Sequence, residues 1–235
     1  MPVFAAFLAF ALAAWLTRSF ANPMSRLHIL DHPNERSLHA RPTPRMGGVA
    51  IMIVAGSIWG TFLLFASQGA SRELLWLGGL GLPVAAVSYL DDRRHVPVGL
   101  RLGVHVATAL VLVTTSGLVP ATNTVPTWLM ALLAGLGTVW MINLYNFMDG
   151  MDGFAGGMTV IGFGTFAILG QSAGQPLFAT LNLVLAAAAG GFLIFNFPPA
   201  RIFMGDTGSS TLGLLAAGFS LWGARDGIFP IWIAL

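Results

Sequence analysis

Two adjacent aspartates, Asp91 and Asp92, end a long apolar segment and are followed at once by Arg93 and Arg94. Carboxylates at a helix C-terminus oppose the helix macrodipole, so this position costs free energy unless a cation or a bound substrate offsets it. Two neighbouring acids can also divide their roles, one binding a metal ion and the other accepting a proton. A solvated helix end neutralised by the arginines is the alternative, and the pair alone favours neither interpretation.

Residues 143–153 form a second polar segment with the order Asn-x-x-Asn-x-x-Asp-Gly-x-Asp-Gly. Asn143, Asn146 and Asp149 are spaced to share one helical face, and Asp152 follows in a glycine-containing turn. Their amide and carboxylate groups suit a nucleobase edge or a hydrated cation. An EF-hand calcium loop is a competitor, but the segment lacks the alternating oxygen ligands and final glutamate of that loop. A plain turn is the other alternative.

A third acid, Asp206, follows Gly205 and stands just before the segment Thr207-Gly208-Ser209-Ser210, which opens an apolar stretch. Such an acid can simply be a helix N-cap, whose side chain accepts a hydrogen bond from the first turn. A helix N-terminus with glycine and serine beside it is equally a place for a phosphate group. Both interpretations stay open from these residues alone.

The loop over residues 31–48 contains three prolines, which stop a helix, and ends in the glycine pair 47–48. Paired glycines let the backbone approach a ligand closely. Arg36, Arg41 and Arg45 could clamp phosphate oxygens through bidentate hydrogen bonds. The alternative is a juxtamembrane basic loop that only sets the membrane topology.

The composition excludes an ordinary soluble protein. The 235 residues are 56% hydrophobic and only 9% charged, whereas a soluble domain carries about 25% charged residues. So few charges cannot cover a water-exposed surface of this length, and lipid is the expected solvent. All eleven basic residues are arginines, and no basic run exists to bind a nucleic acid. Cysteine is absent, which excludes disulfides and thiolate metal sites.

A membrane span needs about 20 mostly apolar residues. The sequence therefore predicts an all-α, polytopic transmembrane helix bundle that forms a single integral membrane domain over residues 1–235, with eight complete spans and a truncated ninth. The ninth is expected to begin near residue 227. The eight complete spans are expected at 2–20, 47–67, 74–90, 102–119, 125–145, 154–171, 177–195 and 208–224.

Eight spans place the loops alternately on two sides of the membrane. Most arginines fall on the side that receives the segments 21–46, 91–101, 146–153 and 196–207. The positive-inside rule makes this side cytoplasmic and the N-terminus external. Seven of the nine acidic residues fall on the same side. The polar chemistry is therefore expected to face the cytoplasm.

Together the motifs gather five aspartates, two asparagines and several arginines at one membrane face. Hard oxygen donors of this kind fit a magnesium ion that is bound together with a diphosphate. Zinc would require more histidine or cysteine ligands. The residues therefore predict a magnesium-dependent site for a phosphorylated substrate.

The four motifs occur in an order that resembles the polyprenyl-phosphate N-acetylhexosamine-1-phosphate transferases of glycosyltransferase family 4, over nearly the whole chain. The segments 31–37 and 44–48 look more like the branch that initiates O-antigen synthesis than the related phospho-N-acetylmuramoyl-pentapeptide transferases. The resemblance implies an enzyme of the bacterial inner membrane that transfers a sugar-1-phosphate from a UDP-N-acetylhexosamine to undecaprenyl phosphate. UMP would be released, and the lipid product would initiate a cell-surface glycan.

The resemblance also implies roles for individual residues. Asp91 and Asp92 match the paired aspartates implicated in activating the lipid phosphate or binding metal. Asp206 matches the magnesium ligand, with Asp92 as a second expected ligand, and Arg45 is expected to contact the diphosphate. Four residues match the nucleotide- and metal-side motif: Asn143, Asn146, Asp149 and Asp152.

Family members usually continue through further helices and a late histidine-containing cytoplasmic loop that contributes to substrate binding. This chain stops inside its ninth expected span. It is therefore expected to be C-terminally incomplete or a shortened paralogue, and activity of these residues alone is in question. Homodimers occur in the superfamily, but nothing in the sequence specifies an interface.

A membrane transporter with a cytoplasmic-side acidic ion site is the alternative from another functional class, because intramembrane ionisable groups often mark ion pathways. A transporter, however, is expected to place some of these groups near the bilayer midplane. Here the acids lie at the ends of the expected spans. A purely structural membrane scaffold would leave the clustered aspartates unexplained, so an enzyme is the favoured prediction.

Overall fold

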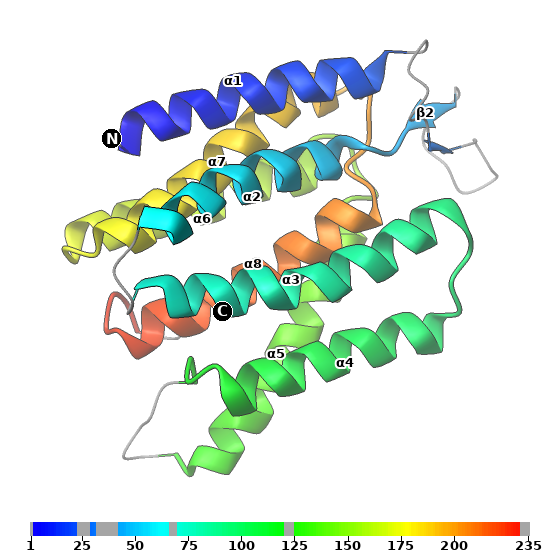
Figure 1. The fold of residues 1–235 in the computed structure, drawn as a ribbon. Coiled ribbons are helices and arrows are strands. Elements are labelled where there is room, and N and C mark those ends of the chain that lie inside the picture. The colour runs from blue at the N-terminus through cyan, green and yellow to red at the C-terminus, as the bar shows by residue number, and fades with distance from the viewer. Residues whose placement is uncertain (1, 23–28, 32–41, 66–69, 120–124, 231–235) are drawn as a thin grey trace.

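The computed structural model describes residues 2–22, 29–31, 42–65, 70–119 and 125–230 (Figure 1). Within these residues the protein is a bundle of eight α-helices, which confirms the predicted all-α polytopic fold. Each of the eight predicted spans corresponds to one helix. Their bounds are α1 Pro2–Ala21, α2 Gly47–Phe65, α3 Ala70–Arg93, α4 Val98–Thr115, α5 Thr127–Met148, α6 Phe154–Ser172, α7 Pro176–Asn196 and α8 Asp206–Arg225.

Proline and glycine set where several helices begin. Pro97 and Pro126 are the residues just before α4 and α5, and Pro176 is the first residue of α7. Proline fixes a φ angle that suits the first turn, where its missing N–H is not needed. Gly153 and Gly205 precede α6 and α8 with φ angles of 75° and 79°, in a region that favours glycine. The short polar loops therefore end at residues that start the next helix.

The outer surface of the bundle is apolar. Large side chains such as Phe4, Trp128 and Phe147 are 68%, 69% and 76% exposed. A soluble protein rarely exposes so many contiguous apolar groups, whereas lipid accepts them. Seven of the described helices, α1 to α7, are long and apolar enough to cross a membrane. The protein is therefore a multi-span membrane protein.

Helix α8 runs through the interior of the bundle (orange in Figure 1). All of its residues from Thr207 to Gly223 are buried, and it packs against α2, α3, α5 and α6. Its hydroxyl side chains mostly bond to its own backbone, as Thr211 does to the carbonyl oxygen of Thr207 at 2.7 Å. Because α8 is enclosed by helices rather than lipid, it can carry more polar residues than the seven apolar helices.

The start of α8 is held against the start of α2 by a close glycine contact. A Cβ atom at Gly48 would lie 2.2 Å from the Cα atom of Gly208, so no side chain fits at this crossing. Next to it, the N–H groups of Gly47 and Gly48 donate to the carbonyl oxygens of Phe203 and Met204 at 3.0 and 2.8 Å. The glycine pair that was expected to approach a ligand therefore lies against the chain itself.

A short antiparallel hairpin, β1 Leu30–Asp31 with β2 Thr43–Pro44, lies beside this crossing and adds a feature that the all-α prediction did not include. The N–H of Phe203 donates to the carbonyl oxygen of Pro44 at 2.8 Å, which joins the hairpin to the loop before α8. At the chain's other limit, residues 226–230 form a turn. Most of the predicted ninth span, residues 231–235, lies outside the described residues.

Candidate active site

Four helices meet at one end of the bundle, the right-hand end in Figure 1: the last turns of α3 and α5 and the first turns of α4 and α8. This end carries four aspartates that we call the carboxylate cluster: Asp91, Asp92, Asp149 and Asp206. α3 and α5 run towards this end, whereas α4 and α8 run away from it. Residues that are 50 to 115 positions apart in sequence therefore become neighbours.

Asp92 caps the N-terminus of α8. Its carboxylate accepts hydrogen bonds from the backbone N–H groups of Asp206 and Thr207, each at 3.0 Å, and from the Thr207 hydroxyl at 2.7 Å. The first N–H groups of a helix lack partners within the helix, and a negative charge there is stabilised by the helix dipole. The cap of α8 therefore comes from another helix, α3, and it fixes the last turn of α3 to the first turn of α8.

Arg101 on α4 joins two members of the carboxylate cluster. Its Nη1 atom donates to Oδ2 of Asp91 and, at 3.1 Å, to Oδ2 of Asp206. Asp91 also accepts a hydrogen bond from the backbone N–H of Val96 at 2.8 Å. Asp91 is therefore held by the turn between α3 and α4 and by Arg101, with only 9% of its side chain exposed.

The segment after α5 closes the other side of the cluster. Asp149 accepts a hydrogen bond from the backbone N–H of Gly205 at 2.9 Å, immediately before α8. One turn earlier on α5, the amide of Asn146 donates to the Ser209 hydroxyl at 3.3 Å. Both contacts draw the end of α5 against the first turn of α8, so that α3, α4 and α5 all converge on residues 205–209.

Burial and the neighbouring carboxylates raise the pKa of two members of the cluster that lie outside the apolar spans. Burial raises the pKa of Asp149 well above its ordinary value, and the charges of Asp206 and Asp92 raise it further, against the lowering effect of the Gly205 N–H. Burial, with the negative charge of Asp92, raises the pKa of Asp206 to about 6. Like charges in a partly buried site disfavour ionisation, and a cation among them would favour it.

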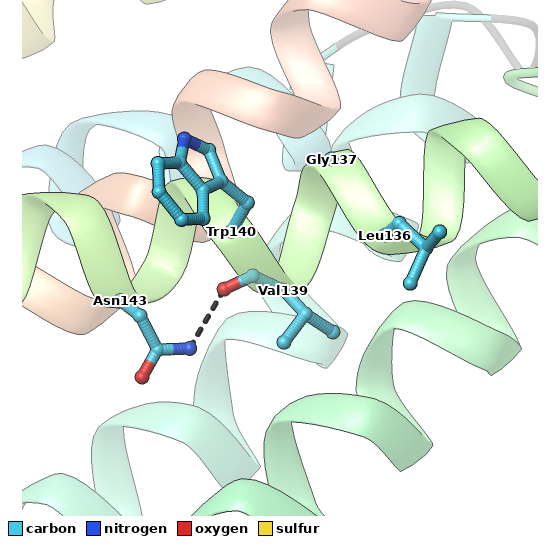
Figure 2. Close-up of a pocket in the computed structure, with 5 residues that line it drawn as sticks. All are labelled: Leu136, Gly137, Val139, Trp140 and Asn143. Atoms are coloured by element: carbon cyan, nitrogen blue, oxygen red, sulfur yellow. Dashed lines mark hydrogen bonds between the residues drawn. The ribbon is translucent and has the colours of Figure 1, made fainter.

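Two residues of the predicted motif are not part of this cluster. Asn143 lies on the exposed side of α5, where its amide donates to the carbonyl oxygen of Val139 at 2.7 Å (Figure 2). Asp152 is exposed, and its carboxylate accepts a hydrogen bond from the backbone N–H of Ala200 at 2.9 Å. The structure therefore gives Asp152 a role in joining the loop after α5 to the loop before α8.

Asn143 ends an open apolar groove along α5. The groove has a volume of about 560 Å³, and its lining residues are Leu136, Gly137, Val139, Trp140 and Asn143 (Figure 2). Asn143 precedes Asn146 by almost one helical turn, but it points to a different side of α5, so the groove lies on the outer face of this helix. Its surface is apolar apart from the Asn143 amide.

Arg45 lies next to the cluster. Its guanidinium donates to Asp31 at 2.7 Å and is 36% exposed. Its carbonyl oxygen borders Gly205, where an added Cβ would lie 2.6 Å from it. Arg36 and Arg41, the other two expected phosphate clamps, lie outside the described residues.

Three residues that the site prediction did not include have clear roles in the structure. Arg101 bridges Asp91 and Asp206, and its position at the start of α4, on the same side as the paired aspartates, was the available signal. Thr207 donates to Asp92. Buried Asn196 accepts from the N–H of Gly153 at 3.0 Å and donates to the carbonyl oxygen of Ile202 at 3.0 Å, so it joins the two loops as Asp152 does.

The described side chains do not by themselves form a complete metal site. In the described part of the chain no three histidine or acidic side chains are arranged to hold a metal ion by themselves. Magnesium, however, is commonly bound by one or two carboxylates together with substrate phosphates and water. The oxygen-only donors of the cluster fit that kind of site and do not fit zinc.

A family comparison covers the part of the chain that builds this site. The sequence profile of glycosyl transferase family 4 matches residues 74–224. The chain belongs to glycosyl transferase family 4. The matched segment runs from α3 into α8 and contains the whole carboxylate cluster, so family 4 membership, predicted from the motif order, is confirmed.

Relatives within the family are similar over most of this chain. A probable undecaprenyl-phosphate N-acetylglucosaminyl 1-phosphate transferase from Bacillus subtilis is 34% identical over 206 residues, covering 84% of this chain and 56% of the relative. A decaprenyl-phosphate N-acetylglucosaminephosphotransferase from Mycobacterium tuberculosis is 33% identical, covering 86% and 58%. A phospho-N-acetylmuramoyl-pentapeptide-transferase from Synechococcus is 34% identical, covering 77% and 56%. The chain thus spans a little over half the length of these relatives.

Proposed function

We propose that this protein transfers an N-acetylhexosamine-1-phosphate from a UDP-sugar to a polyprenyl phosphate such as undecaprenyl phosphate. An oxygen atom of the lipid phosphate attacks the phosphorus atom next to the sugar. The bond from that phosphorus to the bridging oxygen breaks, and UMP leaves with the bridging oxygen. The observation that carries the proposal is the carboxylate cluster, joined by Arg101, at one end of a membrane helix bundle. Similar proteins are named as transferases of this type.

Arg101 supplies a positive charge that is in place before a substrate binds. One guanidinium nitrogen, Nη1, donates to both Asp91 and Asp206 and so fixes the position of the side chain. Preorganised positive charge stabilises the negative charge that spreads over phosphate oxygens in phosphoryl transfer. The lipid phosphate is already largely ionised at neutral pH, since its second pKa is about 6. The reaction therefore does not require Asp91 or Asp92 to remove a proton from the nucleophile.

Magnesium is the proposed cofactor, with Asp206 and Asp92 as its predicted ligands. When bound, it would neutralise charge on the diphosphate oxygens and help UMP to leave. Burial of several carboxylates near each other supports this proposal, because a divalent cation would offset the repulsion that raises the pKa of Asp206. Asp92 already accepts three hydrogen bonds from α8, so Asp206 is the ligand whose removal should affect the metal most directly.

The groove on α5 supports a lipid acceptor. It is apolar and open to the outside of the bundle, and its lining residue Asn143 lies three residues before Asn146, whose amide contacts Ser209 at the start of α8. A polyprenyl chain lying there would remain in contact with lipid while its phosphate reached the polar end. We place this end at the cytoplasmic face of a bacterial inner membrane, because most arginines lie on that side, and we assign the product to the start of a cell-surface glycan.

The test is UMP release by the detergent-purified protein, given undecaprenyl phosphate, magnesium and a panel of UDP-N-acetylhexosamines. Release that depends on both the lipid and the metal is expected, and it identifies the donor sugar. Asp206→Asn should lose metal-dependent release while inserting normally into membranes. Asp226→Asn is the control, because Asp226 bonds to Trp222 and Arg225 at the far end of α8. UMP release without lipid, or wild-type turnover by Asp206→Asn, would contradict the proposal.

A further inference from the structure

A layer of buried polar side chains lies one helical turn beneath the carboxylate cluster. It consists of Ser88 on α3, His105 on α4 and Ser210 on α8, which are 0%, 2% and 1% exposed. Both ring nitrogens of His105 and both serine hydroxyls lack a hydrogen-bond partner among the described residues. Buried polar groups are rarely left in this condition, and each case needs an explanation.

The two serines differ from most hydroxyl side chains in this bundle. Thr159, Thr211 and Ser220 each donate to the backbone carbonyl oxygen four residues earlier, at 2.7 Å. Such a bond satisfies a helix hydroxyl without help from a neighbouring helix. Ser88 and Ser210 do not make it, so their hydroxyls are available to a group between the helices.

The position of Ser88 on α3 follows from its neighbours one turn away. Asp91 faces α4, where it contacts Arg101, and Asp92 faces α8, where it contacts Thr207. Ser88 precedes them by three and four residues, so it lies on the helical face between these two directions. Because α3 runs towards the polar end, Ser88 is one turn deeper in the bundle.

The other two residues reach the same depth from the opposite direction. α4 and α8 run away from the polar end, so His105 lies one turn below Arg101, and Ser210 lies one turn below Asp206. Arg101 and Asp206 are in contact, at 3.1 Å. Residues four positions apart on a helix lie above one another. The layer beneath is therefore built from the same three helices as the layer above.

We propose that Ser88, His105 and Ser210 form an internal water-binding site. This water holds the His105 ring one turn below Arg101 on α4, and His105 is thereby a positioning residue for Arg101. A buried water typically makes about three hydrogen bonds to otherwise unsatisfied polar groups. Two hydroxyls and a neutral imidazole supply both donors and acceptors, and a water can join polar groups that are too far apart to bond directly. The support for Arg101 rests on the proposed transferase function, whereas the water site does not.

A spectroscopic test of the water site needs no enzymatic activity. The protein is labelled with ¹⁵N-histidine and placed in lipid nanodiscs, and the His105→Gln variant identifies the His105 signals among those of the five histidines. We expect a cross-peak between a His105 ring N–H and water, and its loss in the Ser88→Ala/Ser210→Ala double variant. A His105 ring without that cross-peak, or a cross-peak unchanged in the double variant, would overturn the proposal.

Thermal unfolding in detergent distinguishes a water site from a merely unpaired side chain. Replacing an unpaired buried polar group by an apolar one is close to neutral or stabilising. The control is Thr17→Val, because the Thr17 hydroxyl on α1 is buried and lacks a partner in the described structure. We expect Thr17→Val to leave the midpoint unchanged or raised, His105→Leu to lower it and His105→Gln to recover most of the loss. A midpoint of His105→Leu at or above wild type would overturn the proposal.

The positioning role is read from turnover once UMP release is established. His105→Leu should lower kcat with little change in KM for the UDP-sugar, and His105→Gln should restore kcat. Equal kcat values for His105→Leu and wild type would remove the positioning role. Absence of UMP release by the wild-type protein would contradict the proposed function instead, and the spectroscopic result would still stand.

Discussion

The Asp92→Asn variant tests whether α3 holds the start of α8. In the native protein the Asp92 carboxylate accepts hydrogen bonds from the N–H groups of Asp206 and Thr207 and from the Thr207 hydroxyl. Asparagine has the same shape but only one acceptor oxygen, and its NH₂ group would face an N–H donor. The variant therefore removes one side of the cap and the negative charge at the N-terminus of α8.

The size of the effect follows from the bonds that are lost. Removal of an N-cap costs about 0.5–2 kcal/mol. The Asp92 charge also repels Asp149 and Asp206, so its loss carries no further penalty, and we expect Asp92→Asn to lower the free energy of unfolding by about 1–2 kcal/mol through the lost hydrogen bonds. In a chain of this size 1 kcal/mol changes the unfolding midpoint by about 2–4 °C, which gives a decrease of about 2–8 °C.

The assay is thermal unfolding of the detergent-purified protein, followed by tryptophan fluorescence. The control is Asp152→Asn, because the exposed Asp152 carboxylate accepts a hydrogen bond from the Ala200 N–H but caps no long helix; its midpoint should change by less than that of Asp92→Asn. In a double-mutant cycle, Asp92→Asn and Thr207→Val should couple by at least about 0.5 kcal/mol. A wild-type midpoint for Asp92→Asn, or strictly additive effects in the cycle, would refute the capping role.

Two further variants test the rest of the site. Arg101→Gln should reduce the rate of UMP release about 10- to 100-fold, because two charge-assisted bonds to Asp91 and Asp206 are lost; a rate within twofold of wild type would contradict its role. Gly48→Ala should lower the unfolding midpoint, since overpacking typically costs about 1–3 kcal/mol. Gly56→Ala on the same helix is its control, because an added Cβ there meets nothing within 4 Å, and equal midpoints for the two variants would show that the α2–α8 crossing tolerates a side chain.

The helices were predictable because lipid imposes a simple requirement on sequence. A run of about 20 apolar residues between polar, glycine- and proline-containing loops has few alternatives to a membrane span. The order of polar motifs along alternating spans also predicted that Asp91, Asp149 and Asp206 would meet at one end. The short β1–β2 hairpin was not predicted, because two-residue strands leave no hydrophobic period in the sequence.

The positions of individual side chains were less predictable. Each step of three residues turns about 300° around a helix, so Asn143 and Asp149 are about 120° apart, and only the later part of the motif faces α8. The cap formed by Asp92 joins residues more than 100 positions apart, which no local pattern reveals. Likewise, the glycine pair at 47–48 indicated a close approach, but the sequence did not show that Gly208 is the partner.

The most direct test of the central claim follows the phosphorus atom next to the sugar. The purified protein is incubated with undecaprenyl phosphate, magnesium and a UDP-N-acetylhexosamine whose sugar-linked phosphate carries ³²P. A sugar-1-phosphate transferase moves this label into the lipid extract in step with UMP release, and Asp206→Asn should abolish both. Label that stays in the aqueous phase as UDP while the sugar moves to the lipid would show that the bond to the sugar breaks instead, and would contradict the account.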